Sequence, residues 1–157
     1  MAKRSKVDTC RTIQLILDTS CHQLLTVGYQ NMSYTTLSQA TQISRTGISH
    51  HFPKKTDFLI ALEGRFLKLL VDHLTINEGS DALELSWQKA LQSKEFTAIL
   101  RLVFHHSVIR SEACYFSQRL MSNLSKVISS HLGPQAERQV EYLLGVSLVH
   151  IARHSQI

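Results

Sequence analysis

One short polar segment, "SRTGISHH" at residues 44–51, carries the residue types with the clearest chemistry in this sequence. An arginine can donate a forked pair of hydrogen bonds to guanine O6 and N7, and a threonine methyl or hydroxyl can meet a base edge. Hydroxyl and imidazole groups can hydrogen-bond to phosphate oxygens. Together with Lys54 and Lys55, which follow directly after Pro53, these side chains favour contact with double-stranded DNA.

The spacing of this segment places its polar residues on one face of a helix expected from Arg45 to His51. On a wheel of about 100° per residue, Ile48 points inward, with Ser44 and Phe52 close to it. The residues that then face outward or lie on the flanks are Arg45, Thr46, Gly47, Ser49, His50 and His51. The first two would read bases, whereas the last three would hold phosphates.

Gly47 stands in the middle of this helix, where glycine costs about 1 kcal/mol relative to alanine. A small residue lets the helix backbone approach base edges and phosphates closely. A packing reason for the glycine is an equally good explanation, and the sequence leaves both open.

The excess positive charge lies in the first third of the chain. Residues 1–55 hold seven basic side chains against two acidic ones, whereas residues 56–157 hold ten of each. The whole net charge of +5 therefore belongs to the first segment. This asymmetry indicates a polyanionic partner for that segment alone.

Apolar residues recur at helical spacing along the chain, and no segment alternates as a strand would, so the sequence predicts an all-α protein of eight helices. The second and third helices are short and joined by a tight turn, as in a helix-turn-helix. The expected division is a three-helix DNA-binding domain at residues 1–53, a connecting helix at 54–74 and a helical dimerisation and effector domain at 75–157.

The segment "GYQNMSYTTLSQATQISRTGISHHFPKKTDFLIAL" resembles the N-terminal domain of the TetR/AcrR family of bacterial transcriptional regulators. Within the family it is similar to the LuxT- and SwrT-type regulators of vibrios. The resemblance covers about residues 9–74. The residues on key positions of the family pattern are Gly28, Tyr29, Leu37, Ala40, Ile43, Ser44, Ile48, Phe52, Lys55 and Phe58.

This resemblance implies a homodimeric repressor that binds a pseudo-palindromic operator and is relieved by a small-molecule effector, with a link to quorum-sensing-type control. The positions it assigns to DNA contact are Ser33, Thr35, Ser44, Arg45, Thr46, Gly47, Ser49, His50, His51 and Lys55. Two features depart from the family pattern. Gly47 and Ser49 replace the usual threonine and tyrosine, and Gln42 replaces the usual turn glycine, so that the turn must accept a side chain.

The last predicted helix is apolar on more than half of its circumference, which is more than one short domain can cover. A four-helix bundle between two copies would bury the surplus, and an internal core helix is the alternative. The residues expected at the dimer interface are Phe116, Leu120, Leu124, Val127, Val140, Leu144, Leu148 and Ile151.

A small apolar effector could occupy a cavity in the same domain, although the aromatic and aliphatic spacing also fits plain core packing. The residues that would line this cavity are Phe66, Leu70, Trp87, Ile99, Val103 and Phe104. The short C-terminal part of the chain favours a pocket smaller than is usual in the family.

Neither catalysis nor a cofactor or metal ion is expected. The sequence has no H-E-x-x-H pair, paired-cysteine spacing, nucleophile elbow or phosphate-binding glycine loop. His105, His106 and Cys114 could cluster, but their spacing is not that of a metal site. Redox sensing by Cys10 and Cys21 is a minor alternative, because thiol reactivity needs exposure and a cationic setting.

No secretory signal and no apolar run of roughly 20 residues is present, which predicts a cytoplasmic protein with no membrane partner. A second functional class stays open, namely a protein-interaction module whose helical C-terminal surface recruits a partner while DNA contact is secondary. Salt dependence separates the two, because phosphate binding weakens steeply with salt and apolar docking does not.

Overall fold

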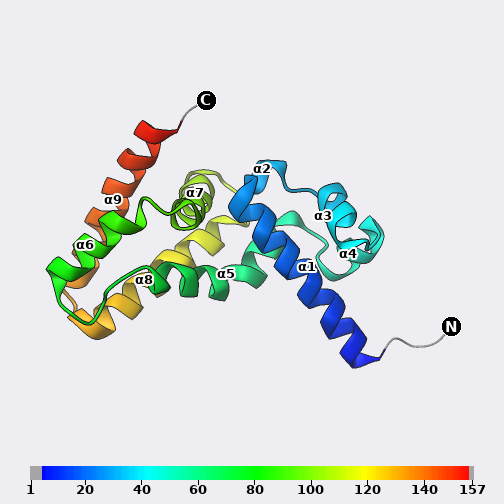
Figure 1. Cartoon of the computed structure of the whole chain (residues 1–157), viewed down its shortest axis with the longest axis horizontal. Coiled ribbons are helices and arrows are strands. Elements are labelled where there is room, and N and C mark those ends of the chain that lie inside the picture. Colours follow the sequence, from blue (N-terminus) through cyan, green and yellow to red (C-terminus); the bar gives the residue numbers. More distant parts are fainter. Residues whose placement is uncertain (1–4, 156–157) are drawn as a thin grey trace. The chain divides into compact units, whose positions relative to one another are not determined.

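The computed structural model describes residues 5–155, which are all α-helical with short connections, as the sequence predicts. These residues form two compact units, the first ending at Leu62 and the second beginning at Glu63. The helices labelled in Figure 1 are α1 Lys6–Thr26, α2 Gly28–Asn31, α3 Tyr34–Thr41, α4 Arg45–His51, α5 Lys55–Asp72, α6 Ser80–Ala90, α7 Lys94–Val108, α8 Cys114–Leu132 and α9 Ala136–His154.

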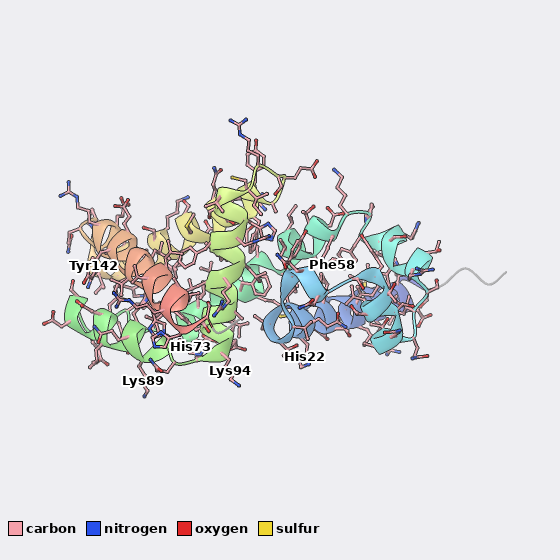
Figure 2. The ribbon with its side chains drawn as sticks, turned by 90° about the horizontal axis from the view of Figure 1, so that it is seen from above. His22, Phe58, His73, Lys89, Lys94 and Tyr142 are labelled. Atoms are coloured by element: carbon pink, nitrogen blue, oxygen red, sulfur yellow. The ribbon has the colours of Figure 1, made fainter. Side chains whose placement is uncertain are left out.

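The first unit is built around apolar side chains from α1, α3, α4 and the start of α5. Its fully buried residues are Ile16, Leu24, Met32, Leu37, Ile48, Phe58, Leu59 and Leu62. Phe52 stacks on Phe58 with ring centroids 4.8 Å apart, and Phe58 lies inside this unit in Figure 2. Burying several large side chains of this kind supplies most of the driving force that holds these helices together.

A side-chain bridge fixes α1 against α3 in this unit. Gln23 donates from Nε2 to the backbone oxygen of Thr36 over 3.1 Å and accepts from the Thr36 hydroxyl over 2.7 Å. Because both ends of the Gln23 amide are used, the bridge sets the position of α3 along α1.

The sequence predicts one helix fewer than the described residues contain. Gly28 ends α1, as expected, with φ of +82°, a conformation that favours glycine. The chain then makes a single helical turn, α2, before Met32. Four residues are too few to show a 3.6-residue apolar repeat, so periodicity could not find this turn.

The second unit contains α6 to α9 and the part of α5 that begins at Glu63. Trp87 of α6 is fully buried, packs edge-on against Phe96, and donates from Nε1 to the Ser147 hydroxyl of α9 over 2.8 Å. Ser117 of α8 donates to the backbone oxygen of Val103 in α7 over 3.0 Å. These buried hydrogen bonds satisfy polar groups that would otherwise destabilise the core.

The break between the two units falls inside α5, at Leu62 and Glu63, and not at either end of the expected connecting helix. This division into two compact units does not test the functional roles in the expected three-part division, which stays a prediction. One continuous helix contributes its first half to the core of the first unit and its second half to the core of the second.

Candidate DNA-binding surface

The turn between α3 and α4 is held by backbone geometry at Gln42. Gln42 has φ of 59° and ψ of 20°, and its N–H donates to the backbone oxygen of Ser38 over 2.9 Å. This left-handed conformation is the one that glycine adopts most easily. The Gln42 amide compensates by donating to the backbone oxygen of Gln39 over 2.9 Å. The turn thus accepts the side chain that the sequence places there.

Side-chain caps fix the start of both short helices. The Ser33 hydroxyl accepts from the Thr36 N–H over 3.1 Å, and the Thr36 hydroxyl accepts from the Ser33 N–H over 2.9 Å. This reciprocal pair is a capping box, which satisfies backbone donors at the start of α3. In α4, the Ser44 hydroxyl accepts from the Gly47 N–H over 3.0 Å. Ser44 therefore begins α4, and its own O–H remains able to donate to a phosphate.

One buried side chain sets which face of α4 points outward. Ile48 has no exposed surface and lies in the core of the first unit. Arg45, Thr46 and His50 are exposed, whereas Ser49 and His51 are half-buried on the flanks. The surface formed by Ser44, Arg45, Thr46, Gly47, Ser49, His50 and His51 is called the α4 face below. It contains seven of the ten residues expected to contact DNA.

The other three expected contacts lie on neighbouring elements of the same unit. Ser33 and Thr35 stand at the start of α3, where Thr35 is exposed and Ser33 is half-buried. Lys55 opens α5 and its Nζ lies 4.2 Å from the centre of the Tyr29 ring. Lys3 and Arg4, which contribute to the basic first third, lie outside the described residues.

Tyr29 positions the Lys55 ammonium group through a cation–π contact. Burial lowers the pKa of Lys55 and raises the pKa of Tyr29. Both shifts have the same main cause, because a partly buried site disfavours the charged form of either group, and Tyr34 raises the pKa of Tyr29 further. The sequence singled out Lys55 by family position, but its partner Tyr29 gave no charge or spacing signal beyond the family pattern.

Tyr34 is a positioning residue that the sequence did not single out. Its hydroxyl donates to the backbone oxygen of Phe52 over 2.6 Å, and its ring lies 5.9 Å from that of Phe58. The hydrogen bond satisfies the Phe52 carbonyl at the end of α4, a position for which the helix itself has no N–H donor. The pKa of Tyr34 is raised by burial and, to a smaller extent, by the Asp57 carboxylate. The end of α4 is thereby fixed to the first turn of α3.

The structure offers a packing reason for Gly47. An added Cβ would lie 3.1 Å from Cγ2 of Ile43 and 3.2 Å from the Ser44 hydroxyl oxygen. The second contact would press on the same hydroxyl that caps the Gly47 N–H. Close packing around the cap is therefore one explanation of the glycine, beside the close approach of the helix backbone to DNA.

In the second unit, the residues expected to line an effector cavity belong to the core. Phe66, Leu70, Trp87, Ile99 and Val103 are buried and Phe104 is half-buried. Phe66 packs edge-on against Phe116, with ring centroids 6.1 Å apart. Effector binding at these residues stays a prediction.

The residues expected at a dimer interface divide into two groups. Phe116, Leu120, Leu124, Val140 and Ile151 are buried within the chain itself, which matches the alternative of internal core helices for that side of α8 and α9. Val127 and Leu144 are half-buried, and Leu148 is 51% exposed.

The outer side of α9 carries a groove that the sequence did not predict. Its volume is about 600 Å³, and Tyr142, labelled on α9 in Figure 2, is the first of its lining residues along the helix. The residues that line it are Tyr142, Gly145, Val146, Val149, His150, Arg153 and His154. These residues share one face of α9 at helical spacing, but the face is less apolar than the core side of the helix, so periodicity alone does not single it out.

Two further features bear on what the chain can bind. Among residues 5–155, no three or more His, Cys, Asp or Glu side chains gather in a way that could hold a metal ion. Within the same residues, no helix is long and apolar enough to cross a membrane.

Comparison with known proteins finds matches in both units. Residues 63–151 match the family described as tetracycline repressor LuxT C-terminal domain. Over 152 residues the chain is 23% identical to the probable acrEF/envCD operon repressor of Escherichia coli strain K12, and equally to that of strain O157:H7. The alignment covers 89% of this chain and 65% of each relative, so the chain spans just under two thirds of their length.

Proposed function

This chain belongs to the tetracycline repressor family with a LuxT C-terminal domain, and on that premise we propose that it is a DNA-binding transcriptional repressor whose α4 face reads an operator. The resemblance read from residues 28–62 is confirmed at the level of the family. Membership points to a transcriptional regulator and not to an enzyme. The proposed place of action is the cytoplasm, on double-stranded DNA.

The observation that carries this proposal is the exposed α4 face on a helix whose opposite side is anchored by Ile48. Arg45 and Thr46 stand in the first turn of α4, where a recognition helix contacts base edges. Ser33, Thr35 and Lys55 supply further phosphate contacts from α3 and α5 in the same unit. In this assignment Arg45 discriminates between bases, and the hydroxyl, imidazole and ammonium groups supply affinity for any duplex.

Fluorescence anisotropy across a salt series tests the proposal. It compares the affinity of the protein for duplex DNA from the region upstream of its own gene with its affinity for a scrambled duplex. Affinity should fall steeply with salt, because bound phosphates release counterions. Arg45→Ala should remove about 1–3 kcal/mol of discrimination between the two duplexes. Arg138→Ala, which removes an exposed guanidinium from α9, is the matched control and should leave discrimination unchanged.

Each alternative result has a defined meaning. Salt-sensitive binding without discrimination between the two duplexes would mean that the operator lies elsewhere in the genome. Selection from a random DNA pool would then identify it. A failure to bind any member of that pool would overturn the proposal and favour a protein-interaction module that uses the outer side of α9. Equal losses in Arg45→Ala and Arg138→Ala would remove Arg45 from the base-reading role.

We further propose that two copies pair along the groove side of α9, so that two α4 faces meet a pseudo-palindromic operator. Support comes from the exposure of Tyr142 and Val149, at 60% and 47%, beside Leu148 on the same helix. Large exposed apolar side chains gathered on one surface are typical of protein interfaces. Relief by a small apolar effector and a quorum-sensing-type link stay predictions of the family resemblance.

Sedimentation equilibrium tests the pairing. Tyr142→Glu should weaken a homodimer at least about tenfold, because it buries a charge in an apolar contact. Leu85→Glu places the same charge at a 70% exposed apolar position on α6 and should leave the dimer unchanged. The opposite ranking of the two variants would move the interface from α9 to α6.

A further inference from the structure

Two histidines in the last turns of α9 form a pair with the spacing of a chelating site. His150 and His154 are four residues apart on one face of a regular helix. Their rings lie with centroids 4.3 Å apart at an interplanar angle of 26°. We propose that His150 and His154 bind a divalent transition-metal ion of the Zn²⁺, Ni²⁺ or Cu²⁺ class. Residues at i and i+4 are neighbours on a helix surface, and two histidines at this spacing are an established arrangement for a metal ion.

The hydrogen bond of His154 prepares it as a ligand. Its Nδ1 lies 2.8 Å from the backbone oxygen of His150. A carbonyl oxygen can only accept, so Nδ1 must carry the proton, and the neutral ring therefore presents the lone pair of Nε2. This is the usual outer-shell arrangement of a metal-binding histidine, in which the second ring nitrogen donates to a backbone carbonyl.

The backbone beneath the pair is held in place by contacts within the second unit. Ile151, between the two histidines, is buried. Arg101 of α7 donates to the Ser155 hydroxyl over 2.9 Å, and that hydroxyl donates to the backbone oxygen of Ile151 over 2.7 Å. Holding the helix end in place lowers the entropy cost of bringing both rings onto one ion. The χ2 torsion of histidine is broad, so the His150 ring can turn from the stacked arrangement toward a shared ion while His154 keeps its Nδ1 hydrogen bond.

Local electrostatics acts in two directions. The last carbonyl groups of a helix carry partial negative charge, which favours a cation at the end of α9. Arg153 lines the same groove and opposes a cation. Imidazole is a borderline ligand that suits Cu²⁺, Ni²⁺ and Zn²⁺ and leaves Mg²⁺ and Ca²⁺ to oxygen ligands. The site should therefore bind Cu²⁺ more tightly than Ni²⁺ or Zn²⁺, and should not bind Mg²⁺.

Two protein ligands leave the remaining coordination positions to water or to another molecule. The pair therefore agrees with the finding that no three or more His, Cys, Asp or Glu side chains gather to hold a metal ion in the described part of the chain. The expectation of no metal site rests on the spacing of His105, His106 and Cys114, which belong to α7 and α8 and not to this pair on α9.

Isothermal titration of the full chain with NiCl2 and with ZnCl2 tests the site. One ion should bind per chain, and His150→Gln or His154→Gln should each weaken binding by about a hundredfold, because either one removes the chelate. His131→Gln is the matched control. His131 makes the same Nδ1 contact to the backbone oxygen four residues earlier, Val127, over 2.9 Å, but has no histidine at that spacing.

Two further readouts keep the outcome decisive. Electron paramagnetic resonance of the Cu²⁺-loaded chain should show two nitrogen ligands, and one in His154→Gln. Arg153→Gln should tighten Ni²⁺ binding, since it removes a nearby positive charge. Absence of a 1:1 site in the unmodified chain, or equal weakening by His131→Gln and His154→Gln, would overturn the proposal. Circular dichroism of each variant, all at exposed or half-buried positions, checks that the chain still folds.

His150 and His154 also line the groove proposed for dimer contact. If the dimer forms there, which rests on the proposed function, metal binding should affect dimerisation. Ni²⁺ should shift the monomer–dimer equilibrium of the unmodified chain and leave that of His154→Gln unchanged. Sedimentation equilibrium with and without Ni²⁺ measures this shift. If calorimetry shows the site but the equilibrium does not move, the dimer contact lies away from the pair and the metal site stands. If neither occurs, the metal site itself is refuted.

Discussion

Two surfaces were assigned to partners from the sequence, the α4 face and the apolar stripes of α8 and α9, and they differ in how far the assigned side chains reach solvent. On α4, Arg45, Thr46 and His50 are exposed as expected. On α8 and α9, most of the assigned apolar residues lie in the core of the chain's own second unit. A polar stripe on a short helix indicates a side that reaches solvent. An apolar stripe on a long helix indicates either packing in the chain's own core or contact with a second copy.

The physical reason for this difference is how clearly each helix shows which of its sides faces the core. A seven-residue helix with one inward side chain, Ile48, has its core-facing side fixed, and every polar residue must then face outward or sideways. A helix of 19 residues such as α9 presents apolar residues over much of its circumference. Hydrophobicity is non-directional, so it does not distinguish a neighbour in the same chain from a second copy.

The largest expected effect tests the core assignment of Phe116. Phe116→Ala should lower the free energy of unfolding by about 3–5 kcal/mol, because it leaves a cavity beside Phe66. Urea denaturation at two protein concentrations measures the loss relative to the unmodified chain. The loss should be equal at both concentrations, since Phe116 packs within the chain.

Tyr142→Ala is the comparison for this prediction. Tyr142 is 60% exposed, so its truncation should leave the stability of the single chain nearly unchanged and act only on association. If the effect of Phe116→Ala depended on protein concentration, Phe116 would lie at the dimer interface. The α4 face and the apolar stripes of α8 and α9 would then no longer differ in how far their assigned residues reach a partner.

Residue types and periodicity were enough to predict the all-α class and the bounds of α4. The family resemblance, and not periodicity, indicated that the turn at Gln42 must accept a side chain, and the left-handed backbone there is known only from the structure. Residue types and periodicity did not predict α2, which is too short to show a period. They also missed the Tyr34 hydrogen bond to Phe52 and the Trp87 hydrogen bond to Ser147, which join residues 18 and 60 positions apart. Such contacts depend on how helices cross, and a single sequence does not encode that crossing in any local pattern.

A middle-sized effect concerns polar side chains of α8 that contact Glu63 of α5 within the chain. Arg119 donates to one oxygen of Glu63 from Nε over 2.9 Å and from Nη2 over 2.8 Å, and Asn123 donates to the other oxygen over 3.3 Å. Glu63 is 15% exposed and Arg119 is 51% exposed, so solvent screens the pair partly. The bridge fixes α8 against the second half of α5.

Glu63→Gln should therefore lower the free energy of unfolding by about 1 kcal/mol, toward the upper end for partly exposed ion pairs. The difference should shrink in high salt, which screens the charge–charge attraction. Urea denaturation at low and high salt measures both effects. Glu137→Gln, at an exposed position in the first turn of α9, is the control and should change stability by less. A salt-independent loss in Glu63→Gln would assign the effect to hydrogen-bond geometry and not to charge.

The smallest expected effect decides between the two explanations of Gly47. Alanine should gain about 1 kcal/mol of helix propensity over glycine. At Gly47 this gain is offset, because the new Cβ meets Ile43 and the capping hydroxyl of Ser44, and a lost cap costs about 1 kcal/mol. Gly64 in α5 has no atom within 4 Å of an added Cβ, so Gly64→Ala should show the full gain. Thermal unfolding of the two variants should place Gly64→Ala above Gly47→Ala by about 1 kcal/mol. Equal stabilisation of both, together with weaker DNA binding by Gly47→Ala alone, would mean that the glycine serves the approach to DNA and not the cap.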